Sequence, residues 1–580
     1  MTHLGKFSIA LTALGLLVAG PARAADDAVP APRLLPPGVQ AFVTVPDVPK
    51  LKDQWNETLL GRLRDEEELA DFWRDVDAQL RKASADLEQE IGVSLEDLLA
   101  VPSGELTLAF VAEEGQTPGG VMLLDYGENE ETINTLLETA SEKLTEEGAE
   151  RSTAEFEDTR LVIYTFPKDE EDQNSEERSV AYFLRDSYLV VATERSLLEA
   201  VLARWNGEHP KTFADDEVFQ YVRQRSTVPN AEPALMWYVD PVRLVQTIVR
   251  TQDEADFQTQ MAMSFLEPLG LTQIRGMGGA FDLATERYDV VNRTFIYVEP
   301  PAKGVLELAR FPAVEQSPPD WAPADAPSYL QVNWDVQSAW AGLEKIVDSF
   351  QGMGAFQRII DRAAQNENGP KVHPKKDVLD QLTGTVHVLT RPPEEEGDAA
   401  QPPQPDYLVA LDLKDAQKIR DVLSRVAEAP NVPVEAREFQ GETIYEIPTD
   451  PKNPAVGNAL SLAVGQGQLL LSNDVTMIEG ILRDDGDRKP LAETQEYRRI
   501  AEQFPEETSL IGYQRQDTQI KLLYNMLRSG RTELEIEGID FTKLPEFEVI
   551  EKYLPPTGAY AVPDEHGALY VTFSLRKDER

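Results

Sequence analysis

Two stretches of the chain share one pattern of apolar and polar positions. Residues 180–202 read VAYFLRDSYLVVATERSLLEAVL, and residues 460–482 read LSLAVGQGQLLLSNDVTMIEGIL. Each stretch predicts a strand, a tight turn, a second strand and the first turns of a helix. Three positions are identical in the two stretches: Leu189, Glu199 and Leu202 in the first, and Leu469, Glu479 and Leu482 in the second.

The region before the first stretch alternates between helical and strand patterns. Apolar residues recur every three or four positions over 69–91, which predicts one amphipathic helix. Ser94 is placed to cap a second, shorter helix. The remaining predicted elements here are a helix over 95–100, strands over 105–112, 120–126 and 161–166, and a helix over 130–144.

The second half of the chain repeats this order of elements. Corresponding segments lie about 280 residues apart, which is outside the repeat lengths of solenoids and propellers and predicts two homologous halves. The corresponding segments are 42–45 with 329–332, 104–109 with 384–389, 121–125 with 408–412, and 235–238 with 510–513. Short alternating strands joined by hairpin loops favour an α+β fold, in which each half is a mainly antiparallel sheet with helices packed on one face.

These patterns divide the chain into five predicted parts. The parts are a signal peptide (1–24), a disordered tail (25–33), a first α+β repeat (34–299), a proline-rich linker (300–325) and a second α+β repeat (326–580). Two polar runs, 168–178 and 392–406, lack apolar periodicity and predict exposed loops.

The first residues carry an export signal. Lys6 precedes the apolar core 7–19, and Ala22, Arg23 and Ala24 form a small-x-small cleavage site, so we expect a mature chain that starts at Ala25. The alternative is an uncleaved anchor, although the apolar run is shorter than the roughly 20 residues that span a bilayer. We therefore expect a periplasmic or extracellular protein with no stable membrane span after cleavage.

The composition of the chain limits the classes of partner that it is expected to bind. The chain has 102 acidic and 55 basic residues and a formal net charge of −47. Phosphate backbones and anionic lipid surfaces repel such a chain on average, which disfavours nucleic acid as a partner. Cysteine is absent, so disulfides and lipoprotein modification are both excluded.

The chain also resembles a group of known proteins. The motif is a strand, a short turn, an LVVA-like strand and a helix, followed by Leu/Phe-Ala-Asp/Glu. It falls at 188–193 with Phe213, Ala214 and Asp215, and at 468–473 with Leu491, Ala492 and Glu493. In this motif the chain resembles uncharacterised exported bacterial proteins with a domain of unknown function, here in tandem. The resemblance implies an envelope location and supplies no catalytic residues.

Histidines and nucleophile motifs give no clear reaction. His3, His209, His373, His387 and His566 form none of the pairs typical of zinc sites. Alternation along 385–389 places His387 opposite two valines, and we expect it on a solvated face. No G-x-S-x-G motif is present.

Acidic and glycine-rich segments provide weaker candidates. Asp125 and Asp412 end corresponding strands, and they could form an acid/base pair or, as we favour, satisfy turn and helix-start amides. The other candidates are calcium loops at Asp484, Asp485 and Asp487 or at Asp215, Asp216 and Glu217, and a phosphate loop at Gly276, Gly278 and Gly279. None has the spacing of a known calcium or phosphate loop, and for the glycines we prefer a tight entry into a strand. Whether the chain binds a metal stays open.

Aromatic residues line the predicted helices and one strand. They are Trp55, Trp73, Trp334, Trp340, Phe356, Trp237 and Tyr238. Most are expected in the core, but a sheet roofed by helices could use some of them to line a groove for an apolar ligand or a peptide.

No set of residues specifies a reaction, so the sequence does not define a function, a catalytic residue or a cofactor. We expect an acidic binding or structural protein of the bacterial cell envelope whose partner is an unidentified envelope protein or ligand, and we lean against an enzyme. The alternatives are a carboxylate-dependent hydrolase of envelope glycans and a carrier of an apolar ligand.

Overall fold

A computed structural model describes most of the chain. The described residues are 29–91, 93–167, 178–208, 211–251, 257–366, 369–392, 405–430, 433–449, 459–483, 488–530, 536 and 538–576. The predicted signal peptide and most of the predicted loops 168–178 and 392–406 lie outside them. Within them, no helix combines the length and the apolar character needed to cross a membrane.

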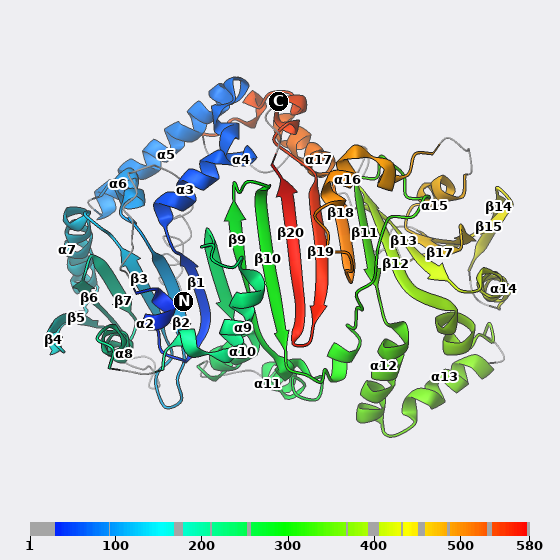
Figure 1. The fold of residues 1–580 in the computed structure, drawn as a ribbon, viewed down its shortest axis with the longest axis horizontal. Helices are drawn as coiled ribbons and strands as arrows, with labels where there is room; N and C mark the ends of the chain where they lie inside the picture. The colour runs from blue at the N-terminus through cyan, green and yellow to red at the C-terminus, as the bar shows by residue number, and fades with distance from the viewer. Residues whose placement is uncertain are drawn as a thin grey trace.

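Twenty strands form one antiparallel sheet that runs across the whole molecule (Figure 1). The first ten are β1 (Val39–Val45), β2 (Leu106–Val111), β3 (Gly119–Asp125), β4 (Glu150–Phe156), β5 (Thr159–Thr165), β6 (Ser179–Arg185), β7 (Tyr188–Ala192), β8 (Leu235–Val239), β9 (Ile274–Leu283) and β10 (Tyr288–Val298). The second ten are β11 (Ser328–Asn333), β12 (Leu382–Arg391), β13 (Asp406–Leu413), β14 (Glu435–Phe439), β15 (Glu442–Pro448), β16 (Ala459–Gly465), β17 (Gln468–Ser472), β18 (Leu510–Gln514), β19 (Thr557–Asp564) and β20 (Gly567–Leu575).

Both sets of ten strands are paired in the same order. The first runs β4-β5-β6-β7-β3-β2-β1-β8-β9-β10, and the second runs β14-β15-β16-β17-β13-β12-β11-β18-β19-β20. The sets meet where β10 pairs with β20, with Arg293 opposite Val571. The sheet is therefore continuous, with β4 and β14 as its free edges.

Helices follow corresponding strands in the two sets. Those of the first set are α2 (Ala31–Leu34), α3 (Val48–Glu57), α4 (Leu59–Arg62), α5 (Ala70–Ile91), α6 (Leu95–Ala100), α7 (Glu130–Glu146), α8 (Arg195–Trp205), α9 (Glu217–Ser226), α10 (Pro241–Arg250) and α11 (Phe257–Ser264). Those of the second set are α12 (Val336–Gln351), α13 (Ala355–Gln365), α14 (Ala416–Ala427), α15 (Val475–Leu482), α16 (Gln495–Ala501), α17 (Gln516–Arg528) and α18 (Phe547–Glu551). Ser94 caps α6 through the amide of Asp97, as the sequence predicts.

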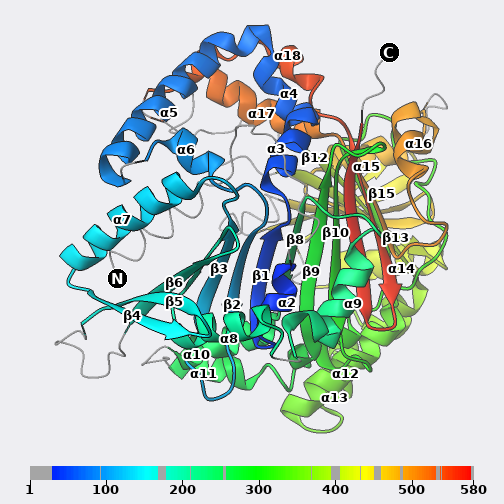
Figure 2. The ribbon, with the colours of Figure 1, turned by 60° about the vertical axis from the view of Figure 1, so that its left-hand side comes forward.

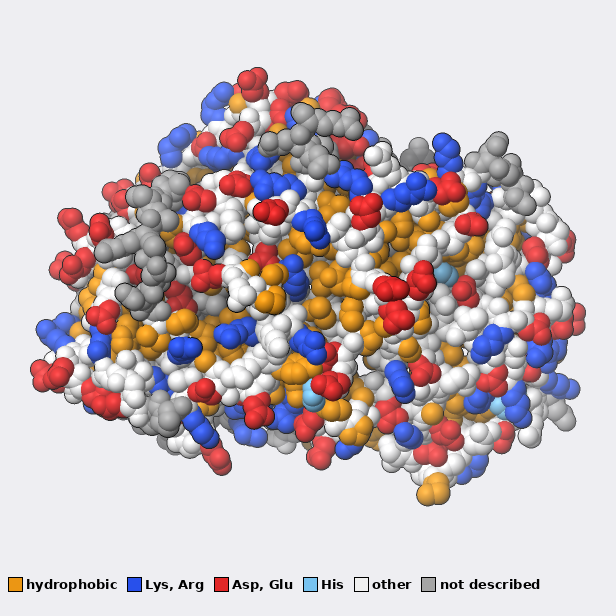
Figure 3. Space-filling model, in the orientation of Figure 1, with side chains coloured by type: hydrophobic (Ala, Val, Ile, Leu, Met, Phe, Trp, Pro, Cys, Tyr) orange, Lys and Arg blue, Asp and Glu red, His pale blue; other side chains and the backbone are white. Residues whose placement is uncertain are grey.

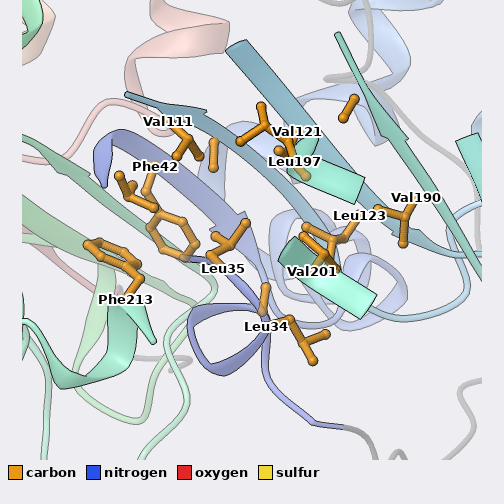
Figure 4. Packing of buried hydrophobic residues seen from close by; sticks show 14 of the residues in the cluster. Leu34, Leu35, Phe42, Val111, Val121, Leu123, Val190, Leu197, Val201 and Phe213 are labelled. Atoms are coloured by element: carbon orange, nitrogen blue, oxygen red, sulfur yellow. The ribbon is translucent and has the colours of Figure 1, made fainter. Parts of the chain in front are cut away.

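One face of the sheet, the covered face, carries two large buried clusters. In the first, Phe42, Leu123 and Val190 of the strands pack under α2 and α8 (Figure 4). In the second, Leu408 and Leu470 pack under α15 and α16. Each set of strands therefore has its own apolar core on the same side of the shared sheet.

The expectation that helices pack on only one face is wrong. α7 buries Ile133 against Leu124 and Leu189 on the face opposite α8, and α14 buries Ile419 against Val464 and Leu469 in the corresponding place. Figure 2 shows α7 on one side of the sheet and α2 and α9 on the other. We call β3–β7 and β13–β17, the outer strands of the two sets, the arms. Both faces of the arms need helices over them, because apolar residues occupy both alternating sets of strand positions.

Helices of the two sets also pack on each other. Leu69, just before α5, shares a cluster with Tyr524 of α17 and Phe547 of α18. The Lys543 ammonium lies 2.7 Å from an Asp75 carboxylate oxygen at the same contact. This contact and the β10–β20 pairing thus join the first set of strands and helices to the second.

The predicted tail and the predicted linker both contribute residues to the core. Within the predicted tail, Ala31 begins helix α2 and is fully buried in the first cluster. Within the predicted linker 300–325, Trp321 and Ala322 are buried in the second cluster, and Val314 forms a β-bridge with Thr508. We did not predict these contacts from the sequence, because the proline-containing segments have neither a helical nor a strand period.

Candidate functional site

Asp125 and Asp412 occupy corresponding positions but lie far apart. Asp125 ends β3 and Asp412 lies near the end of β13. Ten strands separate β3 from β13 in the sheet. Since neighbouring strands are about 4.8 Å apart, the two carboxylates are about 50 Å apart along the sheet. They cannot serve one glycosidic bond, which needs carboxyl groups within about 10 Å of each other.

The two aspartates also have different partners. Asp125 accepts hydrogen bonds from the amide of Gly127 and the hydroxyl of Ser187, which is the turn role favoured from the sequence. Asp412 does not start the following helix, because Asp415 caps α14. Its Oδ1 lies 3.2 Å from His387 Nε2 and accepts from Gln468 Nε2 at 3.1 Å.

The expected position of His387 on a solvated face is wrong. Its side chain is on the covered face, with the residue only 3% exposed, and the ring of Trp321 packs edge-on against it. Its Nδ1 lies 2.8 Å from the Tyr329 hydroxyl, which donates to Gln331 at 2.9 Å. A buried polar chain therefore links Gln331, Tyr329, His387, Asp412 and Gln468 across four strands.

The protonation states of these hydrogen-bonded residues suit a structural link between strands better than catalysis. Burial raises the pKa of the Asp412 carboxyl, but the hydrogen bond and positive charge of His387, with the Gln468 amide, outweigh burial and hold that pKa below its ordinary value. Burial, with smaller contributions from Tyr497 and Asp412, raises the pKa of Tyr329 well above its ordinary value. The tyrosine thus stays protonated, and both Tyr329 and His387 are buried away from solvent.

The first set of strands has a different polar cluster at the corresponding place. Thr44 is paired with Thr107 across the strands, as Gln331 is paired with His387. Both threonine hydroxyls donate to Glu105, and so does the amide of Ala31. Burial is the largest influence on Glu105 and raises its pKa against these hydrogen bonds. The two polar clusters share a position but not a chemistry.

Asp215 and Asp216, two of the remaining acidic candidates, have structural roles. Asp215 forms a capping box with Thr212, and Asp216 caps α9 through the amide of Phe219, so these carboxylates are already occupied. Asp484, Asp485 and Asp487, like His3 and His209, lie outside the described residues. Among the residues that are described, no group of three metal-binding side chains converges.

The glycines of β9 serve helix packing. A Cβ on Gly276 would lie 2.7 Å from Val218, and one on Gly278 would lie 2.7 Å from Val222. Both valines belong to α9, so the glycines allow this helix to approach the strand closely. A strand position is confirmed, and it lies inside β9 rather than at its entry.

The central strands expose an apolar surface on the face opposite the covered one. We call this surface the open face. It comprises the half-buried side chains of Val43, Leu108, Phe110, Leu235, Trp237, Met277, Phe281, Ile296, Leu330, Val332, Val386 and Val388, and the exposed Tyr570. Cross-strand pairing places these residues on one side, for example Val43 with Trp237 and Leu330 with Val388.

The open face differs from an ordinary solvated sheet face. Antiparallel sheets with one face in water normally place polar residues there. Here β1, β2, β8, β10–β12 and β18–β20 carry no Asp, Glu, Lys or Arg on this face. α7 and α14 cover only the arms on either side. The central part therefore carries apolar side chains mainly on β1, β2, β8, β9, β11 and β12. The strands between them, β10 and β18–β20, add uncharged polar side chains to the same face: Asn292, Thr294, Gln514, Thr557, Thr572 and Ser574.

Two hollows of the described structure lie in the first set of strands and are lined by residues outside the open face. The larger, about 830 Å³, is lined by residues that include Arg151, Glu157, Arg160, Tyr182 and Asn206. A second hollow of about 340 Å³ adjoins it and shares Arg151 and Tyr182. Neither has the apolar lining expected of an enclosed carrier cavity, so the open face is the better candidate for apolar contacts.

A second apolar surface lies at one end of the central strands, on α10, α11, α12 and α13 (bottom of Figure 1). We call it the lower helical edge. It holds nearly half of the large apolar side chains that are exposed in the described structure: Val245, Ile248, Phe257, Met261, Phe265, Leu343, Phe350, Met353 and Ile359. The rings of Phe265 and Phe350 are 5.8 Å apart, which joins the two helix pairs into one surface.

The sequence contains a pattern that indicates the open face: in some strands apolar residues occupy both alternating sets of positions instead of one. β2 reads Leu-Thr-Leu-Ala-Phe-Val, with apolar residues in both alternating sets of positions. Trp237 and Tyr238 are adjacent, with Tyr238 in the buried cluster and Trp237 on the open face. Of the other aromatics, Trp73 and Phe72 join the cluster shared by α5 and α17, and Trp340 packs edge-on against Phe356.

Comparison with known proteins identifies one region. A family model described as "Protein of unknown function (DUF3352)" matches residues 315–532, which contain β11 to β18 and α17. No curated protein and no solved structure matches the chain. The fold is thus an α+β protein with a large open antiparallel sheet, and one part of it is similar to a family of unknown function. The match begins inside the predicted linker, before the buried Trp321.

Proposed function

We propose that this chain is an exported binding protein of the cell envelope that holds an apolar ligand on the open face. The observation that carries the proposal is a sheet face rich in apolar side chains, whose strands β1, β2, β8, β10–β12 and β18–β20 place no charged side chain there, in a chain with a net charge of −47. Apolar area that faces water is unfavourable by about 25 cal/mol per Å², so a bound apolar molecule would stabilise the open face. The ligand class is a molecule with long hydrocarbon chains or fused rings.

Export and duplication are part of the same proposal. The signal pattern at 1–24 supports secretion into the periplasm or medium, where an apolar compound needs a carrier to cross water. The identical pairing order of the two sets of strands supports descent of both halves from one ancestor. A mass of the purified protein that starts at Ala25 would test the cleavage, and a retained signal would contradict it.

Ligand binding is tested with a dansylated long-chain fatty acid and the mature protein. We expect a rise in dansyl fluorescence with energy transfer from Trp237, which lies on the open face. Phe281→Lys and Leu330→Lys should each weaken binding about tenfold or more, because they place a charge against an apolar ligand. Both side chains are half-buried, so the variants should keep a cooperative melting transition.

The matched control is Val228→Lys. Val228 is exposed in the connection after α9 and is not part of the open face. Unchanged binding in the control and weakened binding in both open-face variants would support the proposal. Equal binding by all three variants and the original chain, or no binding at all, would contradict it.

A further inference from the structure

Two polar groups meet over a glycine on the open face. Trp237 and Thr294 lie on either side of Gly279, because both are paired with this glycine across the strands. A Cβ on Gly279 would lie 2.9 Å from the Trp237 indole nitrogen and 3.0 Å from the Thr294 hydroxyl oxygen. The missing side chain therefore lets the indole N–H and the hydroxyl stand over the same point of the sheet.

A second polar pair lies beside the first, where β10 pairs with β20. Asn292 is opposite Thr572 in this pairing, and the Thr294 hydroxyl donates to Asn292 Oδ1 at 3.4 Å. Thr572 is exposed, and Asn292 and Trp237 are half-buried. We call Trp237, Asn292, Thr294 and Thr572 the polar centre of the open face.

The polar centre has hydrogen-bonding groups that the protein itself does not use. Among the described residues, nothing accepts a hydrogen bond from the Trp237 indole nitrogen or from the side-chain nitrogen of Asn292. The Thr572 hydroxyl also has no partner in the described part of the chain. An indole nitrogen and an amide nitrogen are donors only. The polar centre thus offers N–H groups to an oxygen atom of a ligand.

The polar centre is uncharged, unlike the other side of the same strands. Asn292 faces the open side, whereas its neighbour Arg293 faces the covered side and forms an ion pair of 2.5 Å with Asp282. Figure 3, which is viewed from the side of α9, shows acidic and basic side chains spread across that side of the molecule. The strands therefore direct charge away from the polar centre.

The charged residues that flank the polar centre along β9, β10 and β20 already have partners. They are Arg275, Asp289 and Arg576, and each is three or four residues, about 10 Å or more, from the polar centre along the chain. Arg275 and Arg576 lie 2.9 Å and 3.2 Å from glutamate oxygens, and Asp289 accepts a hydrogen bond from a backbone amide. An ionised group at the polar centre would lose its water without gaining an opposite charge from these strands, which is unfavourable.

We propose that the ligand of the open face carries a neutral ketone, ester or amide group with apolar parts on both sides, and that this group accepts hydrogen bonds at the polar centre. This inference rests on the proposed ligand-binding function of the open face. Apolar side chains of β8 and β9 lie on one side of the polar centre, and those of β11 and β12 lie on the other, so the oxygen belongs inside the ligand and not at its end. A pure hydrocarbon would cover the N–H groups of Trp237 and Asn292 and leave them unpaired.

The experiment compares two neutral fluorescent probes. In laurdan a ketone joins a naphthalene ring to a long alkyl chain, whereas diphenylhexatriene contains no oxygen. Trp237→Phe removes the indole N–H and keeps a ring, and Asn292→Leu replaces the amide with an apolar side chain of similar size. Each variant should weaken laurdan binding about threefold to tenfold more than diphenylhexatriene binding, because one hydrogen bond to the ketone is lost. The emission of bound laurdan should also move to shorter wavelength, because hydrogen bonds to the ketone stabilise its excited state.

The matched control is Trp205→Phe. The Trp205 indole donates to Asp186 at 3.2 Å, outside the open face, so this variant removes an indole N–H from another part of the protein. It should leave both affinities and the laurdan emission unchanged. The charge requirement is tested with the dansylated fatty acid and its methyl ester at about pH 8, where the acid is ionised. The ester should bind at least about tenfold more tightly.

The outcomes separate this inference from the proposed function. Binding of both probes with equal losses in Trp237→Phe and Asn292→Leu would overturn the inference and leave an apolar ligand site in place. An ionised acid that binds as tightly as its ester would also overturn it. Failure of the mature protein to bind laurdan, diphenylhexatriene and the dansylated compounds would overturn the proposed function, and the inference with it.

Discussion

His387 hydrogen-bonds to Asp412 on the covered face, with Nε2 3.2 Å from Oδ1, although the two residues are 25 positions apart in sequence. The corresponding place in the first set of strands holds Thr107 and Asp125, which have separate partners. The buried chain around His387 ties β11, β12, β13 and β17 together. The two sets of strands therefore share one pairing order but differ in their buried polar residues.

Removal of the imidazole should destabilise the protein strongly. His387→Ala leaves the Asp412 carboxylate and the Tyr329 hydroxyl without their shared partner, and we expect a loss of about 2–4 kcal/mol in unfolding free energy. Urea denaturation at neutral pH measures this. Thr107→Ala is the control at the corresponding position, with an expected loss of about 1 kcal/mol. Equal losses would contradict the special role of the histidine.

The two corresponding aspartates should respond differently to amidation. Asp412→Asn removes the charge that pairs with His387 and should cost about 1–3 kcal/mol at pH 7. Asp125→Asn keeps a carbonyl oxygen for Gly127 and Ser187 and should cost less than about 1 kcal/mol. Because the pKa of Asp412 is lowered by folding, its stabilisation is present above the ordinary aspartate pKa and disappears as the pH falls through the folded value. The gap between Asp412→Asn and the original protein should therefore narrow below about pH 4.

Glu105 should show the opposite dependence on pH. Its pKa is raised in the folded state by burial, so its protonated form favours folding. That contribution is complete below the ordinary glutamate pKa of about 4.3 and is lost as the pH rises through the folded value. Glu105→Gln should consequently melt higher than the original protein at neutral pH, and the difference should shrink in acid. A variant that melts lower at every pH would show that the ionised carboxylate is favourable.

Replacement of either of two corresponding buried leucines by aspartate should destabilise the protein to a similar extent. Leu189 packs under α7 and Leu469 under α14, and both are buried. Leu189→Asp and Leu469→Asp should each lower the unfolding free energy by more than about 3 kcal/mol, because each buries an unpaired charge. Leu80→Asp, on the exposed side of α5, is the control and should change it little. A small effect at either buried position would break the correspondence between the halves.

Local patterns were sufficient to predict most elements. The predicted hairpin 105–112 with 120–126 is β2 and β3, and the two opening stretches are β6, β7 and α8, and β16, β17 and α15. Alternation also placed His387 opposite Val386 and Val388 correctly. It could not tell which side is buried, because both faces of β12 are apolar around the histidine and only the covering helices decide. The prediction for His387 was therefore wrong about which face of the strand other elements bury, and right about the strand itself.

The pairing of β10 with β20 had no local signal. Nothing in either strand specifies a partner some 280 residues away, and both strands alternate like many others in the chain. The open face and the lower helical edge were missed for a related reason. Sequence patterns show which residues share a side of an element, but they do not show whether another element lies against that side.

The place of β20 also sets an order on assembly. This strand follows the other nineteen in the chain, yet it lies in the middle of the sheet, between β10 and β19. In a polypeptide that crosses a membrane from its first residue to its last, the two arms would emerge as separate bodies. The contacts of α5 with α17 and α18 could join them earlier, but the sheet itself would stay open until the final strand arrived. Quality control of such a molecule would depend on its last few dozen residues far more than on any stretch of similar length before them.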